Sequence, residues 1–178
     1  MLKTLRQFAR ARQGLAAVEF ALIAPVMIMM FYGAIELTSA ADCNGRVSRM
    51  AATAADLVAQ STSVSTSDTT NIFNAAYAIL YPYPSAPAKI VISSLVDNGH
   101  GATTVSWSDA TSNTTPRAKN TTVTIPSGLI TSGSGNSLIL AEITYTYTAP
   151  LTYFTGGTLT LTQSFYSRPR RSVVVAHS

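Results

Sequence analysis

The distribution of apolar residues predicts a membrane-spanning helix near the N-terminus. The run from Phe20 to Ile35 contains no charged side chain and lies between Glu19 and Glu36. A helix needs about 20 residues to cross the ~30 Å hydrocarbon core of a bilayer. Residues 15–41 supply that length if both glutamates are tolerated, so we predict that they form the membrane-spanning helix.

Helical periodicity continues beyond the apolar run. Residues 44–60 repeat apolar side chains on one helical face, and we expect them to extend the first helix across Gly45. That face comprises Val47, Ala51, Ala54 and Val58. A second helix is expected to be capped by Asp68 and to stop at Tyr81-Pro82. Its apolar face would consist of Ile72, Ala76, Ile79 and Leu80.

From Lys89 onward the alternation of apolar and polar residues is typical of strands. The predicted strands are 90–95, 103–108, 137–148 and 158–166, with shorter candidates at 121–125 and at Val173-Val174-Val175. The strands at 137–148 and 158–166 are joined by a loop at 150–157, so we expect them to be antiparallel neighbours. Such alternation predicts a sheet with one face buried and one face wet. The fold class is therefore α+β: a long N-terminal membrane-spanning helix, then a small antiparallel β-sheet domain packed on helix.

The charge distribution indicates an orientation rather than a ligand. Four of the twelve basic residues, Lys3, Arg6, Arg10 and Arg12, precede the apolar run, and the rest of the chain has as many acidic as basic side chains. Basic residues before a span predict a cytoplasmic N-terminus and an exported C-terminal part. Charged residues make up only 11% of the chain, against about 25% in typical soluble domains. A soluble cytosolic enzyme is therefore disfavoured, and nucleic-acid binding is not expected.

Candidate chemistry is sparse in the sequence. His100 and His177 have no cysteine or carboxylate at ligand spacing, and no nucleophile elbow, phosphate-binding glycine loop or metalloprotease helix is present. Cys43, the single cysteine, is expected to be inert. The Arg168-Pro169-Arg170-Arg171 cluster suits either a solvated tail or a grip on an acidic partner. We expect no enzymatic activity, no metal and no cofactor.

Three interpretations of the N-terminal segment compete. It could be a cleaved secretory signal with a small-residue exit at Ser39-Ala40-Ala41, or a plain uncleaved anchor. The third interpretation, a prepilin-type leader, is the one that assigns a role to Gly14 and Glu19 together. Glycine lets a peptide enter a narrow protease site without steric cost. A carboxylate inside a membrane is costly and normally has a partner.

The string from Arg12 to Phe20 resembles the processing site of type IV prepilins, and Glu19-Phe20 resembles the Tad (Flp, type IVc) variant. The continuing sequence through residue 60 is similar to TadE-like pseudopilins, with Pro25 among the matching positions. This resemblance implies cleavage between Gly14 and Leu15 by a prepilin peptidase, which leaves Glu19 as fifth residue of the mature chain. In a pilin-like assembly, Glu19 would pair with the new Leu15 amine and set the register between helices. The small residues Ala17 and Ala21 would allow close helix approach.

The resemblance implies a minor pilin, or pseudopilin, that initiates or caps a Tad/Flp pilus for surface adhesion and biofilm formation. Its expected partners are the prepilin peptidase, the major Flp pilin, a second pseudopilin and the inner-membrane pilus platform. We expect a basic cytoplasmic leader at 1–14, the span at 15–41, a helical continuation at 42–60 and an exported α+β domain at 61–178. The inner membrane is the expected location, with the pilus as a second one. The alternative is a membrane-tethered envelope binding or adhesin domain in which Gly14 and Glu19 are coincidental.

Overall fold

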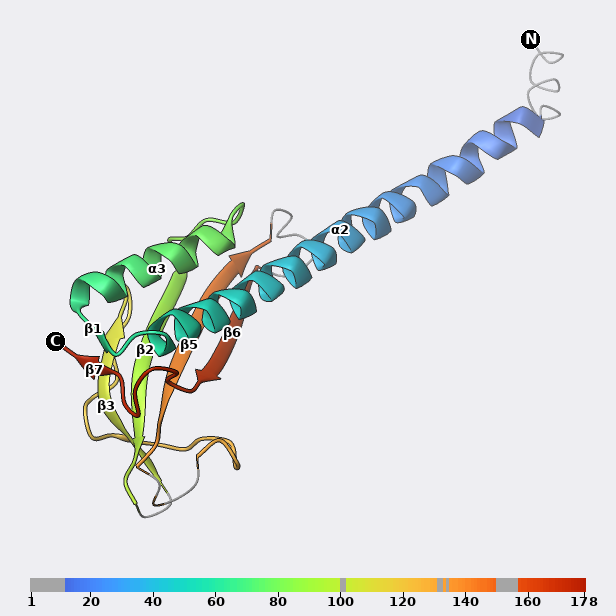
Figure 1. Cartoon of the computed structure of the whole chain (residues 1–178). Coiled ribbons are helices and arrows are strands. Elements are labelled where there is room, and N and C mark those ends of the chain that lie inside the picture. Colours follow the sequence, from blue (N-terminus) through green and yellow to red (C-terminus); the bar gives the residue numbers. More distant parts are fainter. Residues whose placement is uncertain (1–11, 100–101, 131–132, 134, 150–156) are drawn as a thin grey trace, which may run out of the picture. The chain divides into compact units, whose positions relative to one another are not determined.

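The computed structural model describes residues 12–99, 102–130, 133, 135–149 and 157–178. The chain forms two compact units, Met1–Ala40 and Ala41–Ser178, here called unit 1 and unit 2. The basic leader up to residue 11, His100 and most of the predicted 150–157 loop lie outside the described residues. Figure 1 shows the elements in chain order.

The first helix, α2 (Arg12–Ala59), runs without interruption through Pro25 and Gly45. The prediction that the helix continues across Gly45 is therefore confirmed. Alanine, leucine and methionine are frequent along α2, and all three favour helix. Among the helices that the structure describes, α2 is the one long and apolar enough to cross a membrane, with a mean hydropathy of 2.1 in its most apolar window.

Unit 2 contains a five-stranded antiparallel sheet of order β4-β3-β2-β5-β6. Its strands are β2 (Ala88–Asp97), β3 (Thr103–Ala110), β4 (Thr122–Val123), β5 (Ser137–Thr148) and β6 (Thr158–Ser167). Strands β5 and β6 pair from Ile139↔Ser167 to Thr148↔Thr158, as the sequence predicts. The α+β fold class is confirmed.

One face of this sheet is covered by the unit 2 part of α2 and by α3 (Thr66–Leu80), as Figure 1 shows. The inward-pointing residues of β5 are fully or nearly fully buried beneath them: Ile139, Ala141, Ile143 and Tyr145. A polar contact crosses the same interface, where Gln163 Nε2 of β6 donates to Asn44 Oδ1 of α2 at 2.9 Å. The predicted apolar stripe of α2 (Val47, Ala51, Ala54 and Val58) is buried, together with Met50.

The opposite face of the sheet is not uniformly wet. A second cluster of buried residues lies there, made of Leu95, Val105, Val123, Leu138 and Leu140. Apolar residues of the loop after β4, Ile125, Leu129 and Ile130, pack against it. The expectation of one solvated face therefore holds for the C-terminal half of β5, where Thr144 and Thr146 are half-buried, and for their partners Thr162 and Thr160 on β6, which are exposed. The alternation of apolar and polar residues did not predict this second buried cluster, because the residues that pack over it lie in a loop without regular secondary structure.

The segment before α3 is capped and paired in ways that the sequence did not indicate. Ser65, not Asp68, is the N-cap of α3, and the Asp68 carboxylate accepts from the Ser65 backbone N–H in a reciprocal capping box. Just before it, β1 (Ser63–Val64) pairs in parallel with β7 (Ala176–His177). The C-terminal strand predicted at 173–175 thus forms further along the chain.

Candidate functional site: the assembly helix and its junction with the sheet domain

The residues expected to act in processing and assembly occupy the first turns of α2. Gly14, Leu15, Ala17, Glu19, Phe20, Ala21 and Pro25 are all helical and exposed. Leu15 and Glu19 are four residues apart, as are Ala17 and Ala21, so each pair lies on one side of the helix. The structure therefore leaves both the carboxylate and the small-residue stripe accessible to another chain.

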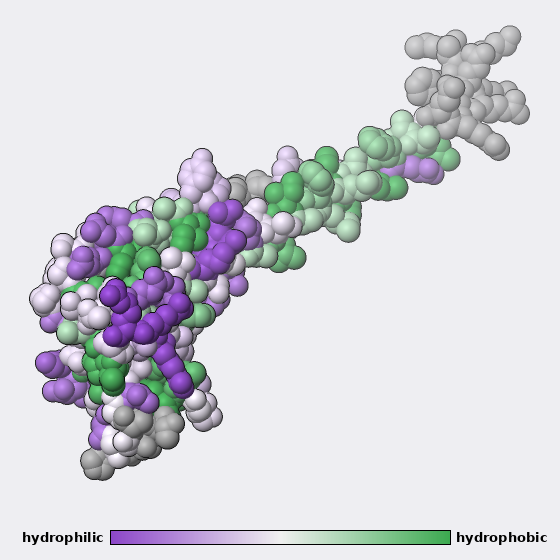
Figure 2. Space-filling view, viewed as in Figure 1, coloured by the Kyte–Doolittle hydropathy of each residue, from purple (hydrophilic) through white to green (hydrophobic). Residues whose placement is uncertain are grey.

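Large apolar side chains around these residues are exposed as well. Figure 2 shows the apolar surface along this stretch of α2. Fourteen such side chains are exposed by between 45% and 75%: Leu15, Val18, Phe20, Leu22, Ile23, Val26, Met27, Ile28, Met29, Met30, Phe31, Tyr32, Ile35 and Leu37. Apolar surface of this extent in water is strongly unfavourable and marks a membrane or protein interaction site.

The apolar stretch from Leu15 to Leu37 contains two carboxylates: Glu36, which is buried, and Glu19, which is exposed. Among the described residues it makes no salt bridge. A carboxylate at membrane depth needs a cationic partner or access to water. In the unprocessed chain the Leu15 nitrogen is a peptide amide, so the expected amine partner exists only after cleavage.

Gly14 occupies ordinary helical geometry in the structure. A β-carbon placed on Gly14 would meet no atom within 4 Å. Packing therefore does not require a glycine here, and an alanine at this position would leave the helix intact. A requirement for glycine would then arise in processing rather than in folding.

A network of polar groups, here called the latch, connects the first turn of unit 2 to the turn after α3. It consists of Asp42 and Arg46 of α2 together with Tyr81 and Tyr83. Arg46 Nε donates to Asp42 Oδ2 at 2.7 Å, and Arg46 Nη1 donates to the Tyr81 carbonyl. Tyr83 OH donates to Asp42 Oδ2 at 3.2 Å. The Arg46 guanidinium also lies 5.9 Å from the centroid of the Tyr83 ring, within cation–π range.

Three titratable groups in or next to the latch have shifted pKa values. The hydrogen bond from Arg46 is the main cause that lowers the pKa of Asp42. Burial raises the pKa of Tyr83 to about 12 and that of the Cys43 thiol to about 11. Cys43 is fully buried, so its thiol stays protonated and shielded at neutral pH. The spacing of Asp42 and Arg46 is the one sequence signal that could have indicated this network.

The basic cluster at 168–171 is a structural tie rather than a solvated tail. Arg170 forms an ion pair with Asp56 of α2, and its backbone N–H donates to the Ala59 carbonyl at 2.8 Å. Arg168 Nη2 donates to the carbonyl of Leu129. A cation near the C-terminal end of a helix is favoured by the helix dipole. Of the two interpretations that the sequence left open, a solvated tail does not hold for Arg168 and Arg170, because Leu129 and the last turn of α2 offer them acceptors.

The fold also brings His177 to a carboxylate, which linear spacing did not indicate. His177 Nε2 lies 2.8 Å from Asp109 Oδ2, and the His177 ring is 5.1 Å from that of Trp107. Trp107 Nε1 donates to the Val175 carbonyl, so this group holds the C-terminal segment against β3. No third ligand joins it: in the part of the chain that the structure describes, no cluster of three metal-ligating side chains occurs.

These observations describe an α+β protein with one exposed apolar helix, which fits a membrane anchor, and one folded sheet domain. Residues 14–56 match the family model described as TadE-like protein, so over this segment the chain is TadE-like, as its sequence predicts. The match starts at Gly14 and ends inside α2, before the sheet. It associates the chain with Tad pilus systems and their components. No curated protein and no solved structure matches the chain.

Proposed function

We propose that this chain is a minor pilin, or pseudopilin, that assists the initiation or capping of a Tad/Flp pilus. The observation that carries the proposal is the position of the TadE-like match. It begins at Gly14 and contains Glu19 and the exposed apolar stretch of α2. In this proposal a prepilin peptidase cuts between Gly14 and Leu15, and Glu19 pairs with the Leu15 amine of the same or a neighbouring subunit.

The sheet domain supports an accessory role over a bulk fibre subunit. Major Flp pilins consist of little more than the N-terminal helix. This chain carries a further folded unit after Ala40. Adhesion and biofilm formation then follow from the fibre that the subunit helps to start. The proposed location is the inner membrane with the N-terminus in the cytoplasm and unit 2 in the periplasm. The proposed partners are the major pilin, a second pseudopilin and the membrane platform.

The experiment that tests the proposal is measurement of the N-terminal residue and intact mass of the chain in its host. We expect a mature chain that starts at Leu15 when the prepilin peptidase is present and at Met1 when it is deleted. A large residue at the cleavage position, as in Gly14→Leu, should block processing. Gly14→Ala is the matched variant with a small side chain, and the structure shows that the helix has room for its methyl group.

Three results would separate the alternatives. A chain that keeps Met1 in the presence of the peptidase contradicts the pilin assignment and favours a tethered envelope binding domain. Cleavage near Ala40 would make the chain a secreted protein instead. If the mature chain starts at Leu15, Glu19→Ala should stay processed but fail to support pili, because the buried amine then lacks its carboxylate.

A further inference from the structure

One edge of the sheet in unit 2 is formed by a strand that no other element covers. β6 is the last strand in the order of the sheet, and on its inner side it pairs with β5 along its whole length. On its outer side, no other described element makes a backbone hydrogen bond to residues 158–167. Because alternate residues of a strand direct their N–H and C=O groups to opposite sides, half of the backbone groups of β6 face outward.

β6 lacks the features that usually protect an edge strand from pairing with another chain. Such edges are typically short, bulged, charged or interrupted by proline. β4, at the other edge of the sheet, has only two residues, and Pro126 follows it closely. β6 has ten residues without a charge or a proline, and its pairing with β5 shows no register shift. Its apolar side chains Leu159 and Phe165 are 50% and 42% exposed. β6 therefore suits the addition of a strand from another protein.

A shallow groove of about 650 Å³ lies beside the C-terminal end of β6. Phe165 and Tyr166 of β6 line it together with Ala52 and Leu57 of α2. Successive side chains of a strand point to opposite faces of its sheet, so every second side chain of an added strand would lie on the face that carries α2. The groove offers those side chains a partly apolar surface.

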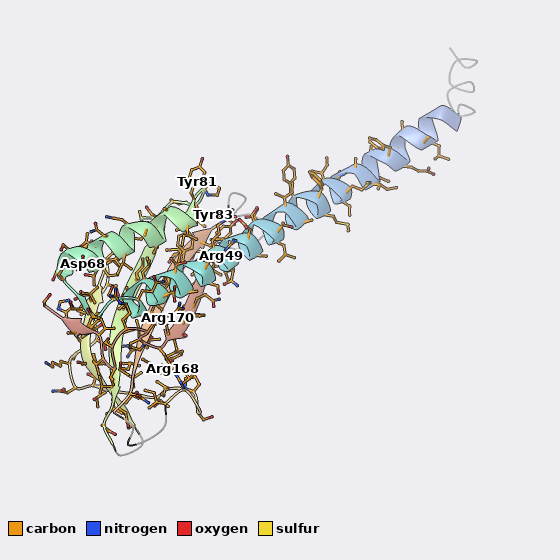
Figure 3. The ribbon with its side chains drawn as sticks, in the orientation of Figure 1. Arg49, Asp68, Tyr81, Tyr83, Arg168 and Arg170 are labelled. Atoms are coloured by element: carbon orange, nitrogen blue, oxygen red, sulfur yellow. The ribbon has the colours of Figure 1, made fainter. Side chains whose placement is uncertain are left out.

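The same end of β6 is strongly basic. Arg168, Arg170 and Arg171 directly follow the strand and are exposed, and Figure 3 shows Arg168 and Arg170 at this end of β6. Arg170 pairs with Asp56, whereas no described carboxylate pairs with Arg168 or Arg171. Arg168 donates to the carbonyl of Leu129, which does not neutralise its charge. Three guanidinium groups with one carboxylate among them favour an acidic ligand.

We propose that the outer edge of β6 and these three arginines dock an extended segment of a partner protein with acidic residues at its N-terminal end. The segment adds to the sheet as a sixth strand. Every pairing in this sheet is antiparallel, and an antiparallel segment places its N-terminal end beside the C-terminal end of β6. Backbone hydrogen bonds supply affinity, while the groove and the arginines select the side chains.

The occupant differs from a second copy of this edge, because β6 itself has no acidic residue to offer the arginines. The docking surface lies wholly within unit 2. The proposal therefore depends neither on insertion of α2 into a membrane nor on processing at Gly14.

Binding of a synthetic strand to the full chain in detergent micelles tests this proposal. The probe is a fluorescein-labelled peptide of about ten residues, the length of β6, with two aspartates followed by alternating threonine and valine. One matched peptide has lysines in place of the aspartates, and another keeps the aspartates but is N-methylated at every residue. Fluorescence anisotropy gives the dissociation constant, and hydrogen exchange of the complex shows which amides become protected.

Two charge reversals locate the acidic end of the peptide. Arg171→Glu is the test variant, because Arg171 makes no ion pair or side-chain hydrogen bond among the described residues, so its loss leaves the contacts of unit 2 intact. Lys119→Glu is the matched control. Lys119 is also exposed, and it precedes Asn120, whose N–H donates to Val105 of β3. Strands β2 and β5 separate β3 from β6.

We expect the acidic peptide to bind at least about tenfold more tightly than the lysine peptide and to slow exchange of the β6 amides. Arg171→Glu should weaken binding about fivefold, and Lys119→Glu should change it by less than about twofold. Equal binding of the N-methylated peptide, or protection outside β6, overturns strand addition. Equal losses in the two variants, or no binding of the acidic peptide, overturn the docking site. Tighter binding of duplex DNA than of the acidic peptide, lost in Arg171→Glu, overturns the assignment to an acidic partner. Each of these failures leaves the cleavage experiment and the pilin proposal unaffected.

Discussion

The two units use the same helix for opposite purposes. In unit 1, α2 carries large apolar side chains on all sides, and those from Leu15 to Leu37 are exposed. In unit 2, α2 carries a stripe in which Cys43, Val47 and Met50 are fully buried against the sheet domain. A helix that is apolar all round needs a membrane or other helices, whereas a striped helix needs a protein core. The change in pattern, and not any break in the helix, marks the boundary.

The largest effect on stability should appear when the same substitution, methionine to alanine, is made separately in each of the two regions. Met50 is fully buried and Met30 is 71% exposed. We expect Met50→Ala to destabilise unit 2 by about 2–5 kcal/mol, because it leaves a cavity in the core. Met30→Ala should leave the stability of unit 2 unchanged. If the two variants unfold at the same denaturant concentration, the distinction between the two regions of α2 is wrong.

The chain offers its own reporter for this comparison. Cys43 is the single cysteine and is buried in unit 2, with the pKa of its thiol raised to about 11. Alkylation of Cys43 should therefore be slow in the folded protein and fast once unit 2 opens. The rate of alkylation against urea concentration measures the free energy of opening in vesicles, where unit 1 stays in the lipid.

The cap of α3 should have the next largest effect. Ser65→Ala removes the side-chain acceptor of the capping box and should cost about 1 kcal/mol. Ser65→Asp is the control, because aspartate is also a good cap, and it should retain most of the stability. A loss with Ser65→Asp as large as that with Ser65→Ala, in the Cys43 alkylation assay, would contradict the assigned cap.

A smaller effect is expected at the paired charges on the second face of the sheet. Arg117 Nε and Nη2 donate to the two carboxylate oxygens of Glu142 at 2.7 and 2.6 Å. Both side chains are about a third exposed, so solvent screens the pair. We expect Arg117→Ala to cost about 0.5–1 kcal/mol. The double variant with Glu142→Ala should cost less than the sum of the single changes, and additive costs would show that the pair contributes nothing.

The sequence predicted regular structure well and irregular structure poorly. The bounds of β5 follow its alternation directly, and the continuity of α2 follows from helix-forming residues around Gly45. The short strand predicted at 121–125 forms in part as β4, but the loop that follows it and covers Leu138 and Leu140 could not be predicted, since Leu129 and Ile130 follow Ile125 without a regular period. The contacts of Asp42 and Arg46 with Tyr81 and Tyr83, and the ion pair of Arg170 with Asp56, depend on tertiary proximity, which spacing along the chain does not encode.

The smallest predicted effect is on the pH dependence of stability at the start of unit 2, where the exposed part of α2 meets its buried part. Arg46 lowers the pKa of Asp42 in the folded chain, so the folded carboxyl is a stronger acid than the unfolded one. The latch therefore adds stability above the unfolded pKa of 3.8, and this contribution is lost as pH falls through the lower folded value. Asp42→Asn should reduce the free energy of opening at neutral pH and flatten its decline below about pH 4.

Thr38, one turn earlier on α2, gives the matched control Thr38→Ala, which should keep the unmodified pH profile. If Asp42→Asn and the unmodified chain show parallel profiles in the alkylation assay, the latch does not stabilise the start of unit 2.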